Sequence, residues 1–164
     1  MNIKNLTKTG VIAALYCALT LTLAPISYGI VQLGVSEVLT VLPRFSKKSI
    51  WGLTLGCFLS NYIGMMIMNT AGLIDVIFGT LATLLAALCS YLTRENKWLV
   101  PLFPMLFNGI IVGGYLHFIA FTQINLFLCM LLVGLGEGIV TYALGIPLID
   151  FIDKHKKIGE ILND

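Results

Sequence analysis

Long apolar runs, separated by short polar segments, dominate this chain of 164 residues. An α-helix rises about 1.5 Å per residue, so about twenty apolar residues are needed to cross the hydrocarbon core of a bilayer. Six such runs are recognisable, at about 9–28, 34–43, 50–68, 72–93, 98–118 and 124–152. The pattern predicts an all-α integral membrane protein with six transmembrane helices, of which the second is short.

The second run, at about 34–43, is too short to cross a bilayer by itself. It reaches across only if the loop before it also enters the membrane. Irregular backbone at that depth is tolerated where protein buries it or where it lines a cavity. We therefore expect the segment before residue 34 to contribute to a cavity wall.

The positions of the lysines and arginines test this topology independently. On the six-helix map they fall at the N-terminus, in every second loop and at the C-terminus, and the other loops contain none. The positive-inside rule assigns that side to the cytoplasm, so both termini are expected there. Without the short second helix this alternation would be lost. The basic residues are Lys4, Lys8, Arg44, Lys47, Lys48, Arg94, Lys97, Lys154, Lys156 and Lys157.

The composition supports a membrane location, because 58% of the residues are hydrophobic and only 11% are charged. In soluble domains about a quarter of the residues are charged. We treat residues 1–164 as a single membrane domain. Four cysteines lie in apolar runs without metal-site or disulfide spacing, so we interpret them as small buried hydrophobic residues. We expect no metal site and no cofactor in this chain. The cysteines are Cys17, Cys57, Cys89 and Cys129.

Carboxylates inside a membrane are costly and are usually functional. Glu37 opens the second helix, Asp75 lies near the start of the fourth, and Glu137 lies midway along the sixth. Other polar and aromatic residues also fall in the middle or outer half of the bundle. This asymmetry predicts a ligand pocket that opens to the outside rather than a pore. The further candidates for its lining are Gln32, Gly34, Asn61, Phe78, Asn108, Tyr115 and His117.

Structural roles are open for several of these residues. Asp75 is also suited to cap a helix start, where an anion is favoured. Asn61 and Asn108 are also suited to join helices by hydrogen bonds. Glu37 has a structural alternative in pairing with a neighbour, and His117 in a helix interface. Most aromatic side chains in such a bundle pack internally or face lipid.

The residue types in the predicted pocket favour a planar ligand rich in hydrogen-bond donors and carrying a positive charge. One carboxylate accepts two parallel N–H bonds from an amidine-like edge. Aromatic rings stack on the faces of such a ligand. A different signal lies in the first helix, where Ala14 and Ala18 form a small-xxx-small pair that lets another helix approach closely. Its partner lies either in this bundle or in another protein.

Four blocks of the sequence, in order, resemble the QueT family. They are LAPISYGIVQLGVSEVLTVLP (23–43), GLIDVIFGTLATLLAAL (72–88), FNGIIVGG (107–114) and VGLGEGIVTYALGIPL (133–148). This family comprises the substrate-binding S components of energy-coupling factor (ECF) transporters for queuosine precursors. The resemblance implies a six-helix S component in the bacterial cell membrane. It implies as partners an EcfT-like coupling subunit, which would dock on Ala14 and Ala18, and two ATPase subunits that hydrolyse ATP.

The resemblance also implies a ligand, namely a 7-deazaguanine such as 7-aminomethyl-7-deazaguanine or queuine. We expect Glu137 on the guanine-like edge and Asp75 or Glu37 on the cationic substituent. One departure bears on ligand choice, because the family pattern Gln-Phe-Arg-x-Ser-Glu appears here as QLGVSE (32–37), with glycine in place of arginine. We interpret Gly34 as removing a cation beside Glu37 and making room for a bulkier substituent.

Rival classes of function remain for comparison. An intramembrane aspartyl protease needs two aspartates that share a proton, whereas GLGE (134–137) offers only a glutamate. The chain also has no P-loop, so it does not hydrolyse ATP itself, and we expect no enzyme activity and no nucleic-acid partner. A small stand-alone secondary transporter lacks support, because no inverted repeat is evident. An S component for a different vitamin is the other alternative.

Overall fold

The computed structural model describes residues 3–27, 31–68 and 72–162, and within these ranges the regular structure is entirely helical. Several long helices contain a single turn of π-helix, so one continuous helix is divided into two or three consecutive elements. The elements run in the order α1 (Ile3–Thr22), α2 (Ala24–Ser27), η1 (Val35–Arg44), α3 (Ser49–Ile63), η2 (Gly64–Met68), η3 (Asp75–Gly79), α4 (Thr80–Leu92), α5 (Leu102–Phe107), η4 (Asn108–Val112), α6 (Gly113–Ile119), α7 (Leu126–Val140), η5 (Thr141–Gly145), α8 (Ile146–Lys154) and α9 (Lys156–Leu162).

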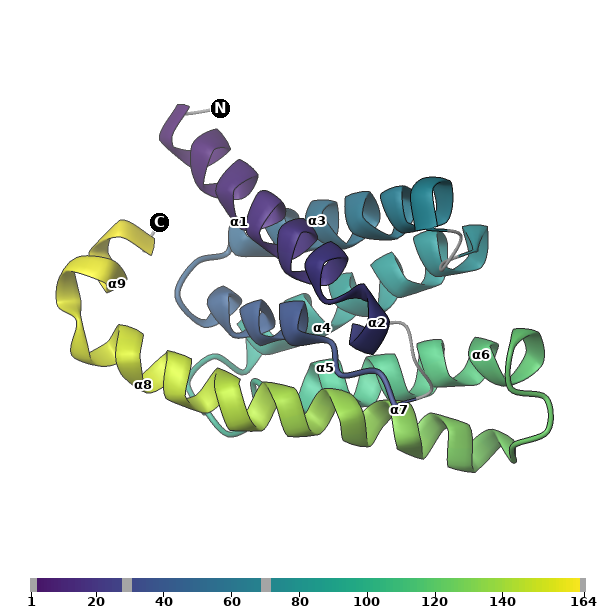
Figure 1. Cartoon of the computed structure of the whole chain (residues 1–164). Coiled ribbons are helices and arrows are strands. Elements are labelled where there is room, and N and C mark those ends of the chain that lie inside the picture. Colours follow the sequence, from purple (N-terminus) through teal and green to yellow (C-terminus); the bar gives the residue numbers. More distant parts are fainter. Residues whose placement is uncertain (1–2, 28–30, 69–71, 163–164) are drawn as a thin grey trace.

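The longer helices pack around the short helix η1. Contacts pass from α1 to α3, then to α4, then to α5 and η4, and then to α7. The short η1 contacts both α1 and the turn η5 after α7, and it also touches α3 and α4. It therefore lies at the centre of the molecule, between α1 and the long helix that runs from α7 through α8 (Figure 1).

The predicted short second helix is present, although it is a 3₁₀-helix rather than an α-helix. Its 10 residues rise about 2.0 Å each, so it spans about 20 Å, which is less than the ~30 Å core of a bilayer. Side chains on nearly all sides of η1 are buried, including Val41 and Leu42. A segment this short is acceptable because surrounding helices, rather than lipid, cover its backbone.

Four helical stretches in the described part of the chain are long and apolar enough to cross a membrane. They correspond to the third, fourth, fifth and sixth predicted spans, and they are Ser49–Ile67, Asp75–Leu92, Leu102–Ile119 and Leu126–Lys154. The first predicted span coincides with α1, which begins at Ile3 rather than near residue 9 and so includes the charged Lys4 and Lys8. The count of six crossings remains a prediction.

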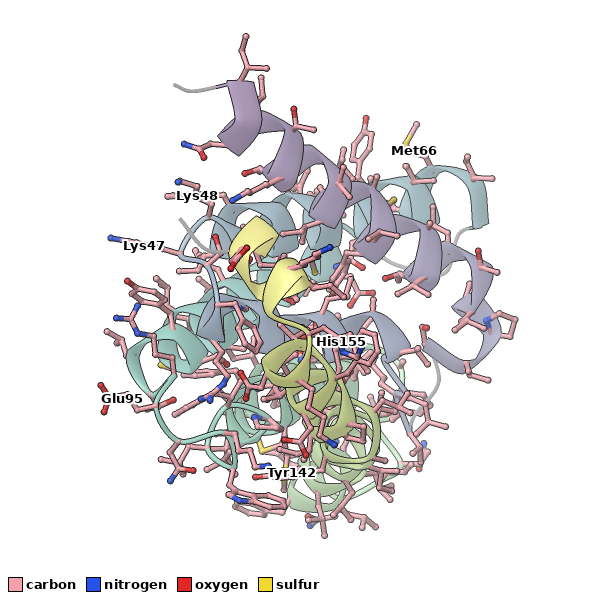
Figure 2. All side chains as sticks on the ribbon, turned by 90° about the vertical axis from the view of Figure 1, so that its left-hand side faces the viewer. Lys47, Lys48, Met66, Glu95, Tyr142 and His155 are labelled. Carbon is pink, nitrogen blue, oxygen red and sulfur yellow. The ribbon has the colours of Figure 1, made fainter. Side chains whose placement is uncertain are left out.

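Helix α1 begins and α9 ends at the same end of the bundle (Figure 1). Basic and acidic side chains pair near this end. Figure 2 looks onto that end, with Lys47, Lys48, Glu95 and His155 around it. Arg44 Nη2 lies 3.5 Å from Asp153 Oδ2. Lys97 Nζ lies 2.6 Å from Asp150 Oδ1. These pairs tie the end of η1 and the loop before α5 to α8, at the end predicted to face the cytoplasm.

Helices α1 and α3 pack closely through two glycines of α3. A Cβ added at Gly52 would lie 2.8 Å from Ile12 Cβ, and one at Gly56 would lie 2.7 Å from Tyr16 Cβ and 2.9 Å from the Ala13 carbonyl oxygen. Contacts of this kind let helix backbones approach within the membrane. On the other face of α1, Ala14 and Ala18 are exposed, so no other described helix of this chain covers them.

We expect Gly56→Ala to destabilise the protein by about 1–3 kcal/mol, because the new methyl group meets backbone atoms of α1 that cannot rotate away. Gly10→Ala is the matched control, since a Cβ at Gly10 meets nothing within 4 Å and alanine is the better helix former. Thermal unfolding in detergent measures both. Equal melting temperatures for the two variants would contradict the close packing of α1 on α3.

Candidate ligand pocket

A polar cavity lies between α1, η1, α3, η3, η4 and α7. It is lined by Tyr16, Thr20, Ser27, Gln32, Gly34, Ser36, Glu37, Cys57, Asn61, Asp75, Gly79, Thr83, Asn108, Val112, Tyr115 and Glu137. Its volume is about 50 Å³, enough for a few water molecules. Asp75 opens the helix that ends near Arg94, and Tyr115 lies near the end of the helix that starts after Lys97. The cavity is therefore in the half of the bundle away from the basic loops.

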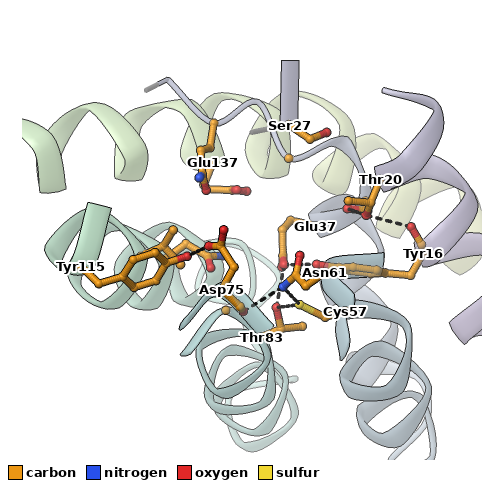
Figure 3. A pocket seen from close by; sticks show the side chains of 16 residues that line it. Tyr16, Thr20, Ser27, Glu37, Cys57, Asn61, Asp75, Thr83, Tyr115 and Glu137 are labelled. Atoms are coloured by element: carbon orange, nitrogen blue, oxygen red, sulfur yellow. Dashed lines mark hydrogen bonds between the residues drawn. The ribbon is translucent and has the colours of Figure 1, made fainter. Parts of the chain in front are cut away.

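Glu37 is held by hydroxyl groups from two other helices. Tyr16 Oη donates to Glu37 Oε1 at 2.5 Å, and Thr83 Oγ1 donates to the same oxygen at 2.8 Å (Figure 3). The second oxygen, Oε2, is buried and has no hydrogen-bond partner of good geometry among the described residues. Because two donors already occupy Oε1, only Oε2 is available to a ligand.

The backbone around Glu37 is fixed by its neighbours. Thr40 Oγ1 donates to the Glu37 carbonyl oxygen at 2.5 Å. Thr20 Oγ1 lies 2.7 Å from Ser36 Oγ and 2.9 Å from the Tyr16 carbonyl oxygen. The start of η1 is thus hydrogen-bonded to the inner face of α1, which makes Glu37 a pre-positioned group.

Asp75 occupies the opposite side of the cavity and is only partly buried. The Tyr115 hydroxyl donates to Asp75 Oδ1 (Figure 3). Asn61 Nδ2 donates to the Asp75 carbonyl oxygen at 3.1 Å. A Cβ at Gly79 would lie 2.8 Å from that Asn61 nitrogen, so the small residue one turn later makes this bond to the helix backbone possible.

Glu137 differs from the other two acids because no hydrogen bond to its carboxylate is found among the described residues. Its side chain is 3% exposed, and its Oε2 is buried without a partner. Its carboxylate points into the cavity from α7 (Figure 3). Both of its oxygens are therefore available for a two-point interaction with a ligand.

Gly34 lies directly against Glu137. A Cβ at this position would stand 2.4 Å from Glu137 Oε1 and 2.8 Å from Oε2. The Glu137 carboxylate fills the space left by the missing side chain, and our interpretation that Gly34 makes room for a bulkier ligand substituent stays a prediction. The acid that faces position 34 is Glu137 and not Glu37. On the same stretch, a Cβ at Gly136 would meet the Gln32 carbonyl oxygen at 2.7 Å, so residues 31–34 lie closely on α7.

Turns of π-helix recur around the cavity. η3 begins at Asp75 and η4 begins at Asn108, while η5 begins one turn after Glu137. Single π-turns inside α-helices are frequent at functional sites, since the extra residue shifts which side chains face inward. Here they turn an acid and an amide toward the same cavity. The sequence pattern alone did not predict them.

Two of the predicted site residues lie away from the cavity. Phe78 is 43% exposed and packs beside Tyr115 with ring centroids 6.3 Å apart, so it supports Tyr115 from outside. His117 Nδ1 donates to the Ile124 carbonyl oxygen at 2.8 Å, which holds the turn between α6 and α7. Phe78 lies on η3 and His117 on α6, and neither residue lines the cavity.

A family model described as QueT transporter matches residues 6–154. The chain belongs to the QueT transporter family. The queuosine precursor transporter QueT of Lactococcus lactis subsp. cremoris (strain MG1363) is 43% identical to it over 76 residues. That alignment covers 45% of this chain and 41% of the relative, which is less than half of each. No solved structure matches the chain. With its apolar helices, this member of the QueT family is a multi-pass membrane protein.

In this QueT-family chain, sequence reasoning missed several residues of the cavity wall. Tyr16 and Thr20 lie one turn apart on the buried face of α1, and this i, i+4 polar pair in an apolar helix was a usable signal. Thr83 stands alone in an apolar stretch and gave a weaker signal. Cys57, interpreted as a hydrophobic residue, also lines the cavity, and its Sγ lies 3.3 Å from Thr83 Oγ1.

Tyr16→Phe is expected to lower ligand affinity about fivefold, because Glu37 loses one of its two hydroxyl donors and becomes less well oriented. Isothermal titration of the purified protein measures the effect. Tyr91→Phe is the control, since Tyr91 lies outside the cavity next to Arg94. Unchanged affinity in Tyr16→Phe would mean that the ligand does not depend on Glu37.

Proposed function

We propose that this protein is the substrate-capture subunit of an ATP-driven ECF-type importer that binds a 7-deazaguanine queuosine precursor from the outside. The observation that carries this proposal is Glu137, a buried carboxylate whose oxygens accept no hydrogen bond from the described residues. A buried charge without a partner is costly. A ligand that brings donors to it would remove that cost on binding.

The chemistry of the cavity supports a cationic, donor-rich ligand. Three carboxylates line it, and none of the described lining residues is Lys, Arg or His. Among the described residues, no three side chains of His, Cys, Asp or Glu are grouped to hold a metal ion. A protonated amine on the ligand therefore provides the missing positive charge.

Two roles follow from the hydrogen bonds that each acid already makes. Glu137 has both oxygens available and fits the guanine-like edge, whose N1–H and 2-amino groups point in parallel. Glu37 and Asp75 each have one oxygen occupied by hydroxyl donors. A single remaining oxygen suits an ammonium group, so these two acids are the candidates for the cationic substituent.

Ligand entry requires the walls to separate. A bicyclic base is larger than the cavity of about 50 Å³, and typical ligand sites have about 300–1,000 Å³. We therefore expect binding to move η1 or α7 outward by a small amount. This outward movement would also let a partner protein distinguish an occupied site from an empty one.

The partners of this proposal are an EcfT-like coupling subunit and two ATPase subunits in a bacterial cell membrane. Support comes from the exposed face of α1, where Ala14 and Ala18 leave the helix backbone accessible to another helix. The basic end of the bundle, with both chain ends, would face the cytoplasm.

The decisive experiment is competition binding with the purified full chain in nanodiscs. We expect 7-aminomethyl-7-deazaguanine or queuine to bind and thiamine, riboflavin and biotin to leave that binding unchanged. Binding of one of those vitamins instead would favour an S component for a different vitamin. Uptake by the chain alone in liposomes, without ATPases, would favour a stand-alone secondary transporter and contradict the ECF mechanism.

A further inference from the structure

A second polar group faces the cavity beside Glu37. Asn108, the first residue of η4, is 4% exposed and lines the cavity. Its amide makes only a poorly aligned hydrogen bond to the Glu37 side chain. Among the described residues, neither Asn108 Nδ2 nor Glu37 Oε2 therefore has a partner of good geometry.

The orientation of the Asn108 amide follows from its neighbour. Turning the amide over would place its carbonyl oxygen against the Glu37 carboxylate, where two acceptors repel each other. The amino group therefore points toward Glu37 and the cavity. The amino group has two N–H donors, so one faces Glu37 and the other is left for an acceptor on the ligand.

Together these atoms specify what the ligand must offer. It must accept a hydrogen bond from Asn108 and, next to that acceptor, donate to Glu37 Oε2. It must also present donors to Glu137. A 7-aminomethyl-7-deazaguanine has this arrangement, because its ring carbonyl lies between the N1–H edge and the aminomethyl substituent.

We infer that Asn108 Nδ2 donates to the ring carbonyl oxygen of the deazaguanine and that Glu37 Oε2 receives its ammonium group. The inference rests on the proposed function and adds to it a residue that determines ligand choice. It assigns the cation to Glu37 rather than Asp75, because Glu37 Oε2 is buried and adjacent to Asn108, whereas Asp75 is partly exposed. Asn108 also excludes bases with an amino group in place of the carbonyl, since two donors would then face each other.

The test compares 7-aminomethyl-7-deazaguanine with its 6-thio analogue. The analogue keeps N1–H, the 2-amino group and the ammonium group, and it changes only the carbonyl oxygen to the weaker acceptor sulfur. We expect the unmutated protein to prefer the oxygen compound by about tenfold. In Asn108→Ala this ratio of dissociation constants should fall to nearly one. Asn96→Ala is the matched control, since Asn96 lies in the loop before α5 and should keep the full ratio.

The ratio of the two dissociation constants shows which claim is contradicted. If the unmutated protein binds both compounds equally, or if Asn108→Ala keeps the tenfold ratio, the role of Asn108 is wrong while the proposed function stands. If neither compound binds the unmutated protein, this inference fails, and the proposed function fails with it when queuine does not bind either. The measurement on the unmutated protein needs no variant to fold, and a general loss of affinity in Asn108→Ala would not by itself change the ratio.

Discussion

Glu137→Gln is expected to weaken binding of 7-aminomethyl-7-deazaguanine by about 100-fold, measured by isothermal titration calorimetry. Glutamine keeps the shape of the side chain but replaces one acceptor oxygen with an amino group, which would face an N–H donor of the ligand. It also removes the negative charge that strengthens both hydrogen bonds. The loss is large because the carboxylate has no other partner among the described residues.

The same variant should not lose stability in the absence of ligand. A buried carboxylate without a partner is unfavourable in the folded state, so its neutral counterpart is expected to melt at the same temperature or higher. Glu160→Gln serves as the control, because Glu160 is exposed on α9 and should change neither quantity. A lower melting temperature together with weaker binding would indicate that Glu137 supports the fold rather than the ligand.

Gly34→Ala is expected to lower affinity for the same ligand by about tenfold or more, because the new methyl group must displace the Glu137 carboxylate. The contact distances would be 2.4 Å to Oε1 and 2.8 Å to Oε2. The backbone of Gly34 has φ of −70°, which alanine adopts without strain. Because the displaced atoms form the end of a flexible side chain, we expect little change in melting temperature.

A double-mutant cycle tests whether this effect acts through Glu137. Gly34→Ala should cost affinity in the unmutated background and nearly nothing when Glu137 is already alanine. Gly10→Ala, which places its methyl group in open space, is the control for adding a methyl group elsewhere. An equal cost of Gly34→Ala in both backgrounds would show that it acts on another part of the site.

The helical architecture follows directly from the order of apolar and polar residues. Runs near 50–68, 72–93, 98–118 and 124–152 coincide with the four stretches that are able to span a membrane. Hydrophobic length is a local property, so it can be read without knowledge of neighbouring segments. The start of α1 at Ile3 was less evident, because the polar residues Lys4 and Lys8 extend a helix beyond its apolar part.

The candidate site residues were predicted from the free-energy cost of placing polar groups in a membrane, and not from the geometry of a pocket. Acids and amides are rarely placed in a membrane without a purpose, and Glu37, Asp75, Asn108 and Glu137 all line one cavity. The same reasoning put His117 at the pocket, but its ring is bonded to a loop carbonyl instead. Residue type shows that a polar group needs a partner, but it does not show where that partner lies.

The sequence by itself determined the helical class, the short second segment, the membrane setting and the set of acids within the apolar segments. Only the tertiary structure decided which oxygens of those acids are already occupied. Tyr16 and Thr83 are far from Glu37 in the chain, yet both donate to one of its oxygens, while Gly34 leaves space that Glu137 fills. The physical reason is that the local sequence pattern shows which residues are costly to place in a membrane. The availability of a single oxygen depends on contacts between segments that meet only when the bundle closes.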